Sequence, residues 1–409
     1  VLGFFFGYMI VAHVLLPLYY KLNLTSIYGY LGTRIGAHTY RTGSFFFLLS
    51  RMLGTAAKLY LVCLILHTHV FQEMHIPFWV IAVSSVTLVW IYTHKSGIKT
   101  IVWTDTLQTF CLIAALLFII YFTIQKLDTG FDGIVQTIRN SEHSRIFVFD
   151  DWISRQNFFK QFFSGIFIVI VMTGLDQDMM QRNLSCKNFK DSQKNMITSG
   201  ISQFFIILLF LMLGVLLYTF TSHQGITNPA KSDELFPMIA TGGYFPIIVG
   251  ILFIIGLISS AYSAAGSALT ALTTSFTVDI LGIKGKTEDT VRKTRKKVHV
   301  GMAIVMGIVI FIFNLLNNTS VIDAVYILAS YTYGPILGLF AFGILTKRQV
   351  RDRYIPLVSI LSPILCFILQ KNSETWFHGY QFSYELLIFN ALFTFIGLCF
   401  LIKKTINLT

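Results

Sequence analysis

The sequence predicts an all-α, polytopic membrane protein with about eleven transmembrane helices, and two observations carry that prediction. The chain is 55% hydrophobic with only 12% charged residues, whereas a soluble chain carries about a quarter charged residues. Its apolar stretches also approach or exceed the ~20 residues that a helix needs to cross a bilayer. In order along the chain they lie near 1–19, 43–70, 77–93, 105–124, 161–175, 197–220, 244–272, 298–316, 321–345, 354–370 and 383–402.

The distribution of basic residues predicts how these helices are oriented. The net charge of +12 alone would suit a nucleic-acid partner, but alternate loops hold 22 of the 31 Lys and Arg residues, and the opposite loops hold 7. The positive-inside rule assigns the richer set to the cytoplasm. We therefore expect a multi-pass protein of the cytoplasmic (plasma) membrane with Thr409 inside, Val1 outside and no nucleic-acid partner. The basic loop 284–297 is a candidate contact for anionic lipid.

The rest of the chain indicates a single transmembrane domain over residues 1–409. Because Val1 lies in an apolar run without a charged leader, we expect a preceding segment to be missing. The five cysteines show no paired spacing and predict neither disulfides nor a metal cluster. Two external polar stretches, about 125–160 and 222–243, are predicted to lie over the membrane surface as lids.

A stripe of hydroxyls runs through one predicted span. Its members recur at spacings of 3, 4, 3 and 4 and therefore share one helix face: Ser260, Ser263, Ser267, Thr270 and Thr274. Each hydroxyl in hydrocarbon needs a partner. That partner is either the carbonyl one turn earlier, in which case the stripe serves packing, or a cation, for which a hydroxyl is a hard oxygen ligand.

Other spans are polar where a membrane helix is normally apolar. Residues 96–108 enter the fourth predicted helix, and residues 172–188 leave the fifth on the same side. Gly334 and Pro335 are expected to break or kink the ninth helix. An acid such as Asp105 either caps a helix or, as an acid within a span, is a candidate functional residue.

Four motifs in these segments, in this order, resemble the sodium:solute symporter family. The family's T-S-x-Y-x-Y-L-x-x-R-F-G is matched at 25–36, with Ile35 in place of the Phe, and G-I-x-x-I-x-W-T-D-x-x-Q lies at 97–108. D-Q-x-x-x-Q-R-x-L-S-x-K-N lies at 176–188, and the serine-rich helix ends in F-T-x-D-I at 276–280. The resemblance covers nearly the whole chain.

The resemblance implies a five-plus-five inverted-repeat transporter fold. Core helices two to ten would occupy about 1–345, two accessory helices about 354–402, and the first core helix would be missing. It implies sodium-coupled symport of a small organic solute into the cytoplasm, with sodium as the coupling ion and no cofactor. The alternatives are a membrane sensor or input module and a sodium-independent carrier of the same fold. An enzyme is disfavoured because no nucleophile–base pair or metal-ligand cluster is evident.

The resemblance also places a cation site on the serine helix. Ser260 takes the position that offers a backbone carbonyl, and Ser263 takes the first hydroxyl position. Ala264 stands where the family usually has a second hydroxyl, so sodium binding would be weaker or coupling lost. Asp105 matches a carboxylate on the cation exit path. The family's pattern is also matched at the inner end of core helix six, where a structural role is as consistent as a functional one: Asp176, Gln177, Gln181 and Arg182.

Three residues fall at positions that face the substrate in the family's sugar carriers. They are Met172, Gln203 and Tyr326, and each differs from the sugar carriers' residue, which disfavours a sugar and leaves a small polar or anionic solute open. Arg51 and Lys58 lie two turns apart within a span. They either attract an anion or pair with an acid elsewhere, and we expect the pairing.

Overall fold

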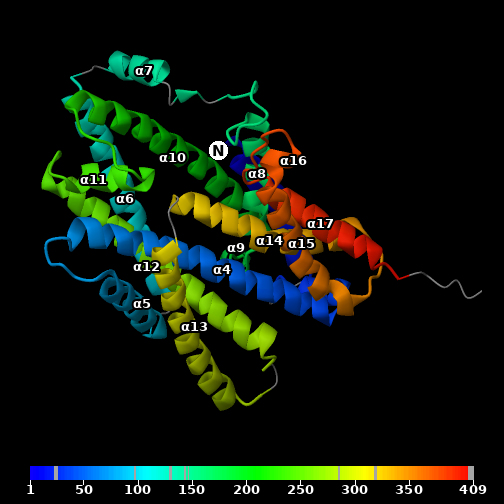
Figure 1. The fold of residues 1–409 in the computed structure, drawn as a ribbon. Coiled ribbons are helices and arrows are strands. Elements are labelled where there is room, and N and C mark those ends of the chain that lie inside the picture. The colour runs from blue at the N-terminus through cyan, green and yellow to red at the C-terminus, as the bar shows by residue number, and fades with distance from the viewer. Residues whose placement is uncertain are drawn as a thin grey trace, which may run out of the picture.

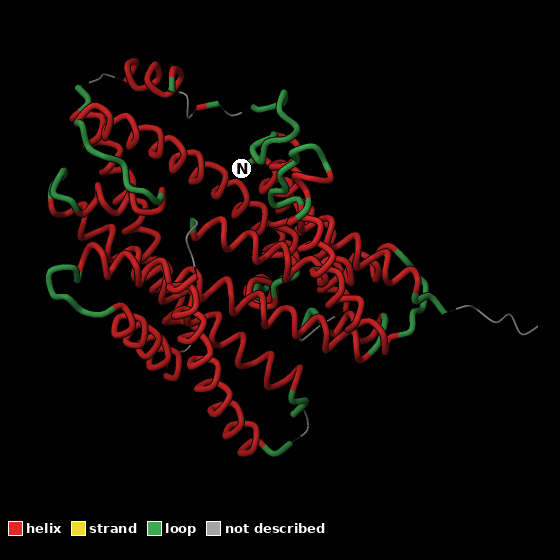
Figure 2. Tube along the Cα trace, in the orientation of Figure 1, coloured by secondary structure: helices red, strands yellow, loops and turns green. Residues whose placement is uncertain are grey.

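In a computed structural model, the described residues are 1–22, 26–95, 98–128, 131–141, 144–145, 147–283, 286–316 and 320–403. Most of them are helical, and this part of the chain contains no strand beyond one isolated bridge (Figures 1 and 2). The helices are α1 Leu2–Ile10, α2 Leu16–Leu22, α3 Gly29–Arg34, α4 Ala37–Ile65, α5 Phe78–Lys95, α6 Ile98–Lys126, α7 Phe131–Asn140, α8 Phe158–Val169, α9 Gln177–Leu184, α10 Phe189–Gln224, α11 Leu235–Thr241, α12 Ile247–Ser275, α13 Glu288–Leu316, α14 Val321–Leu345, α15 Ile355–Lys371, α16 Ser373–Trp376 and α17 Leu386–Phe400. Short π-helical turns extend four of them at Val11–Leu15, Leu66–Val70, Ile170–Gly174 and Phe276–Ile280.

The helices confirm the predicted membrane class. Among the described residues, eight helices are long and apolar enough to span a bilayer. A ninth span is the pair Phe158–Gly174 and Gln177–Leu184, bent by 67°, and α5 and α17 are shorter apolar helices. Each of the eleven apolar stretches expected from the sequence coincides with one of these elements.

Of the expected break or kink at Gly334 and Pro335, the break is wrong, because α14 continues through Pro335 without interruption, and the kink stays a prediction. A proline lacks the N–H that would bond the carbonyl four residues earlier, here that of Tyr331. The side-chain amide of Asn390 on α17 donates to this carbonyl at 3.0 Å and to the neighbouring Ser330 carbonyl at 2.9 Å. The neighbouring helix thus supplies the missing donor, as membrane helices allow.

Small residues let α14 and α17 approach closely enough for this contact. A Cβ added at Gly334 would lie 2.4 Å from the Asn390 side chain, and one at Gly338 would lie 2.6 Å from the Thr394 side chain. Two glycines four residues apart are a common helix-pairing pattern in membranes, where packing rather than water exclusion drives association.

Helix α4 is central to the bundle and packs against α12, α13 and α14 (Figure 1). Large side chains on α4, such as Phe47 and Tyr60, are fully or almost fully buried. Two predicted external stretches contain helices outside the spans, α7 and α11, and Figure 1 shows α7 at the edge of the bundle. The arrangement leaves polar side chains of α4, α6, α9 and α12 facing one another.

Candidate functional site

The first component of the site is the break between α8 and α9. Asp176 caps α9, because its carboxylate accepts from the backbone N–H groups of Asp178 at 3.0 Å and Met179 at 3.1 Å. This is the usual task of an N-cap aspartate. Its side chain is fully buried, so the cap and the charge it carries are both held inside the protein.

Two tyrosines, one from α2 and one from the first loop motif, satisfy carbonyls that the break leaves without helical partners. Tyr19 donates to the Gly174 carbonyl at 2.9 Å, and Tyr28 donates to the Leu175 carbonyl at 2.6 Å. Burial raises the pKa of Tyr28 well above its ordinary value, so the hydroxyl stays protonated as a donor. Gln177 accepts from the Ile27 N–H at 2.8 Å. The loop motif therefore has a structural role in holding the break open.

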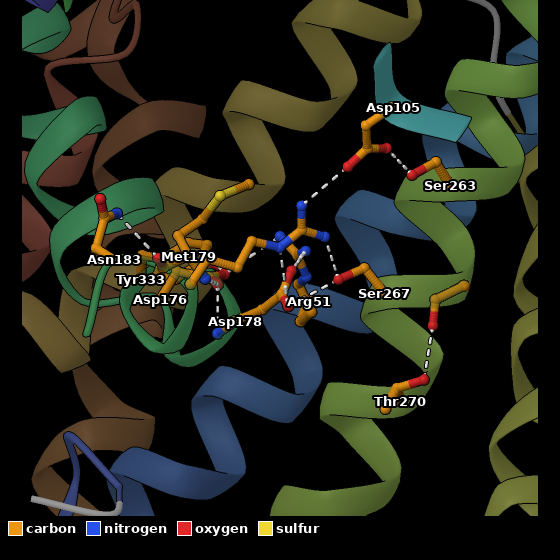
Figure 3. A network of polar contacts seen from close by, with 12 residues as sticks. Arg51, Asp105, Asp176, Asp178, Met179, Asn183, Ser263, Ser267, Thr270 and Tyr333 are labelled. Carbon is orange, nitrogen blue, oxygen red and sulfur yellow. Dashed lines mark hydrogen bonds and ion pairs between the residues drawn. The ribbon is translucent and has the colours of Figure 1, made fainter. Parts of the chain in front are cut away.

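A cluster of five charged side chains, here called the charge network, lies beside the break: Arg51, Asp105, Asp176, Asp178 and Arg182 (Figure 3). Arg51 lies 2.5 Å from Asp178 and 3.4 Å from Asp176. Arg182 lies 3.3 Å from Asp105 and 3.7 Å from Asp178. Two guanidinium groups therefore face three carboxylates, which gives the network a formal excess of one negative charge with all three carboxylates ionised.

The serine helix joins the network through two of its hydroxyls. Ser263 donates to Asp105, and Ser267 accepts from Arg182 and donates to Asp178 at 2.8 Å (Figure 3). Thr270 instead bonds back to the Gly266 carbonyl at 3.0 Å. The stripe is thus divided: its middle part binds side chains of other helices, and Thr270 satisfies its own backbone.

A cavity of about 290 Å³ adjoins this network. It is lined from α4 by Lys58, from the π-turn after α8 by Met172, from α12 by Ser260 and Ala264, and from α14 by Tyr326. Most of its remaining lining is aliphatic. The structure therefore brings together four of the residues singled out from the family resemblance, while Gln203 lies half-buried on α10 outside this lining.

Arg51 and Lys58, the two basic residues within the predicted span, differ in their partners. Arg51 pairs with acids, as expected, whereas the pairing expected of Lys58 is wrong. Lys58 reaches the cavity, and within the described chain it has no hydrogen-bond partner and no carboxylate within 4.0 Å. Beyond Lys58 the cavity narrows to a space of about 20 Å³ beside Arg51 and Tyr333.

Sequence reasoning missed two members of this site. Asp178 and Ser267 received no functional role, although Asp178 is four residues before Arg182 and Ser267 is four residues after Ser263. Both spacings place side chains on one helix face. Their meeting across helices depends on the 67° bend between α8 and α9, which no spacing in the sequence reveals.

A broken helix packed among continuous helices, beside a polar site within the membrane, is the architecture of ion-coupled secondary transporters. A sequence model of the sodium:solute symporter family matches residues 1–352. The chain belongs to this family.

Similar proteins fit this assignment. The chain is 26% identical over 355 residues to the mouse sodium-coupled monocarboxylate transporter 1, covering 84% of this chain but only 56% of that protein. It is 26% identical over 385 residues to the Aliivibrio fischeri sodium/sialic acid symporter NanT, covering 89% of this chain and 72% of that one. A solved Na⁺-coupled sialic acid symporter, substrate-bound and outward-open, superposes with a TM-score of 0.80 at 21% identity over 98% of this chain and 82% of that chain. At that identity the superposition shows the shared fold.

Proposed function

We propose that this protein carries a small organic anion into the cell together with sodium. The observation that carries the proposal is the excess negative charge of the network beside the serine helix. Three carboxylates facing two guanidinium groups within a membrane attract a cation. The relatives are named for sodium-coupled transport, and sodium is the cation we assign.

The proposed cation site lies on α12 next to Asp105. Ser263 and Asp105 supply a hydroxyl and a carboxylate, which are hard oxygen ligands suited to an alkali cation, and Ser260 would add its backbone carbonyl. Ala264 supplies no oxygen, so we expect weak sodium binding. The nearness of Ser263 to Asp105 supports a path on which sodium leaves past this carboxylate.

The proposed solute site is the cavity of about 290 Å³. Its aliphatic lining suits the carbon skeleton of a small metabolite, and Lys58 supplies one positive charge without a carboxylate partner in the described chain. A cation in such an environment favours an anionic ligand over a neutral one. Monocarboxylates and sialic acid, for which the two relatives are named, are organic acids.

The charge network would then act as the inner gate. The space of about 20 Å³ beside Arg51 and Tyr333 is too small for a solute. Movement of the broken helix relative to α4 would separate Arg51 from Asp176 and Asp178 and open the passage. A sodium gradient directed into the cell would drive the solute inward together with the ion.

The test is uptake by the protein in proteoliposomes with an imposed sodium gradient or an equal potassium gradient. The probes are radiolabelled lactate, butyrate and N-acetylneuraminate, with glucose and proline as neutral controls. We expect at least one acid to accumulate only with sodium. Lys58→Met should raise its KM by about tenfold or more, since a charge-assisted hydrogen bond is lost, while Lys58→Arg should retain most of the affinity.

Each failure points to a different part of the proposal. Equal uptake with either gradient would refute sodium coupling and favour the sodium-independent carrier that Ala264 suggests. Sodium-driven uptake of glucose or proline but of no acid would refute the role of Lys58 and leave symport standing.

A further inference from the structure

Helix α13 begins with a stripe of basic residues that faces the inside of the bundle. Arg292, Arg295, Lys296 and His299 lie at spacings that place them on one helix face. The same face continues into the membrane as three residues that are buried against the bundle: Ala303, Met306 and Ile310. Arg292, Arg295 and Lys296 are themselves exposed, but they lie on the helix face that borders a cavity with α5 and α12.

These cations line a second cavity, of about 570 Å³, between α5, α12 and α13. Hydroxyls form its opposite wall, with Thr93 from α5 and Thr270 and Thr273 from α12. Lys286 and Glu288 complete the charged part of the lining. The cavity thus holds four Lys or Arg side chains and one acid, and it is distinct from the proposed solute cavity.

The cations of this cavity have no carboxylate partner, whereas a cation on another face of the same helix has one. Lys286, Arg292, Arg295 and Lys296 form no ion pair within 4.0 Å among the described residues. Lys293, on another face of the same helix, lies 2.7 Å from Asp289. Like charges gathered in a partly enclosed space repel one another, so an anion between them would be favourable.

His299 is a buried member of the cavity lining and contacts two hydroxyls of the opposite wall. Its Nε2 lies 3.0 Å from the Thr93 hydroxyl, and its Nδ1 lies 3.0 Å from the Thr273 hydroxyl. The same hydroxyls also lie near backbone carbonyls, that of Val89 at 2.8 Å and that of Leu269 at 2.7 Å. The two contacts hold the imidazole ring in place between α5 and α12.

The cavity lies where α13 enters the membrane. Beyond His299 the outward face of the helix is apolar, with Val300, Ile304 and Ile308 exposed by 41%, 58% and 55%. The charged turns before it belong to the loop region with the highest density of Lys and Arg, which the positive-inside rule assigns to the cytoplasm. An anion bound here would thus sit at the level of lipid headgroups.

We propose that this cavity binds the phosphate group of an anion at the cytoplasmic membrane surface, with an anionic lipid headgroup as the favoured source. Arginines match phosphate oxygens with paired N–H donors, and the threonine wall offers room for the polar remainder of a headgroup. Basic pockets between transmembrane helices on this side of a membrane suit such headgroups. The phosphate site is separate from the proposed solute and sodium sites. The proposal of a phosphate site and the proposal of sodium-coupled transport can therefore be refuted independently.

The experiment compares two double variants that each remove two positive charges from α13. Arg292→Gln with Lys296→Gln removes cations of the cavity, and Lys293→Gln with Lys297→Gln removes cations outside its lining. Native mass spectrometry of the purified protein would measure bound phosphatidylglycerol against phosphatidylcholine. A parallel titration with glycerol 3-phosphate, in nanodiscs of phosphatidylcholine, tests a soluble source.

We expect phosphatidylglycerol to bind the unmodified protein in preference to phosphatidylcholine. The cavity variant should weaken that binding by about tenfold or more, and the control variant by less than about twofold. Thermal melting of both double variants checks that they are folded. If the cavity variant is not folded, the single variant Arg295→Gln replaces it.

Glycerol 3-phosphate binding as tightly as the lipid, and lost in the same variant, would support the phosphate site and assign it to a soluble ligand. An equal loss in both variants would show general attraction to a basic surface and would overturn the site. If neither phosphatidylglycerol nor glycerol 3-phosphate binds the unmodified protein, the proposed site is overturned as well.

Discussion

Removal of Arg51 should be among the most destabilising single changes in this protein. The Arg51 side chain is 13% exposed and bonds two carboxylates, those of Asp176 and Asp178, which are 0% and 11% exposed. In Arg51→Gln these two acids would remain together without their shared cation. Breaking a buried pair by removing one partner costs about 3–5 kcal/mol, because a buried charge is left uncompensated.

Two features of the site refine that magnitude. Asp176 keeps its two backbone donors and the Tyr333 hydroxyl at 3.0 Å, so part of its charge remains solvated by protein. Asp178 keeps Ser267 at 2.8 Å and Arg182 at 3.7 Å. We therefore expect a loss near the lower end, about 3 kcal/mol.

The chain offers a matched control for this change. Arg145 and Asp150 also form a close pair, at 2.6 Å, but their side chains are 60% and 69% exposed, and such exposed pairs contribute about 0–1 kcal/mol. The assay is unfolding in mixed micelles, followed by tryptophan fluorescence, for Arg51→Gln and Arg145→Gln. If the two losses agree within about 1 kcal/mol, which is the measure of an exposed pair, the account of the charge network is refuted.

Three further changes test other parts of the structure. Ala264→Ser should restore the missing hydroxyl and lower the sodium concentration for half-maximal uptake; an unchanged or raised value would argue against a cation at Ser260 and Ser263. Asn390→Leu should lower the free energy of unfolding by about 1–3 kcal/mol, because two carbonyls beside Pro335 lose their donor, and a change below about 0.5 kcal/mol in the micelle assay would contradict this. Gly338→Leu should cost more than Gly301→Leu, since a Cβ at Gly338 meets Thr394 at 2.6 Å and one at Gly301 meets nothing within 4 Å; equal melting temperatures would exclude the proposed close packing of α14 and α17.

The helices were predictable from the sequence because a membrane helix can be recognised from its own run of apolar residues. About twenty apolar residues satisfy the bilayer regardless of what surrounds them, so every expected stretch coincides with a helix. The break at Pro335 failed for the opposite reason. Whether the helix continues at Pro335 depends on Asn390, which is distant in sequence. The helix propensity of the residues around Pro335 cannot predict that partner.

The candidate site was predictable in part, and the same distinction explains the rest. Ser263 and Asp105 were selected individually, through motif positions on two helices, and the structure places them in contact. The pairing of Arg51 was expected in kind, but Asp178 could not be named because it reaches Arg51 through the bend between α8 and α9. Motifs indicate which residues matter, whereas contacts between elements depend on geometry that motifs do not encode.

Helix α12 connects the three polar regions of this protein. Ser260 and Ala264 face the proposed solute cavity, Ser263 and Ser267 bond the charge network, and Thr270 and Thr273 line the basic cavity. Because these side chains lie on one rigid helix, a shift of α12 relative to its neighbours changes all three environments together. Coupling between sites requires such a shared element whose position each ligand biases. Four hydroxyls of the stripe, Ser260, Ser263, Ser267 and Thr270, thus lie in these three environments along one helix.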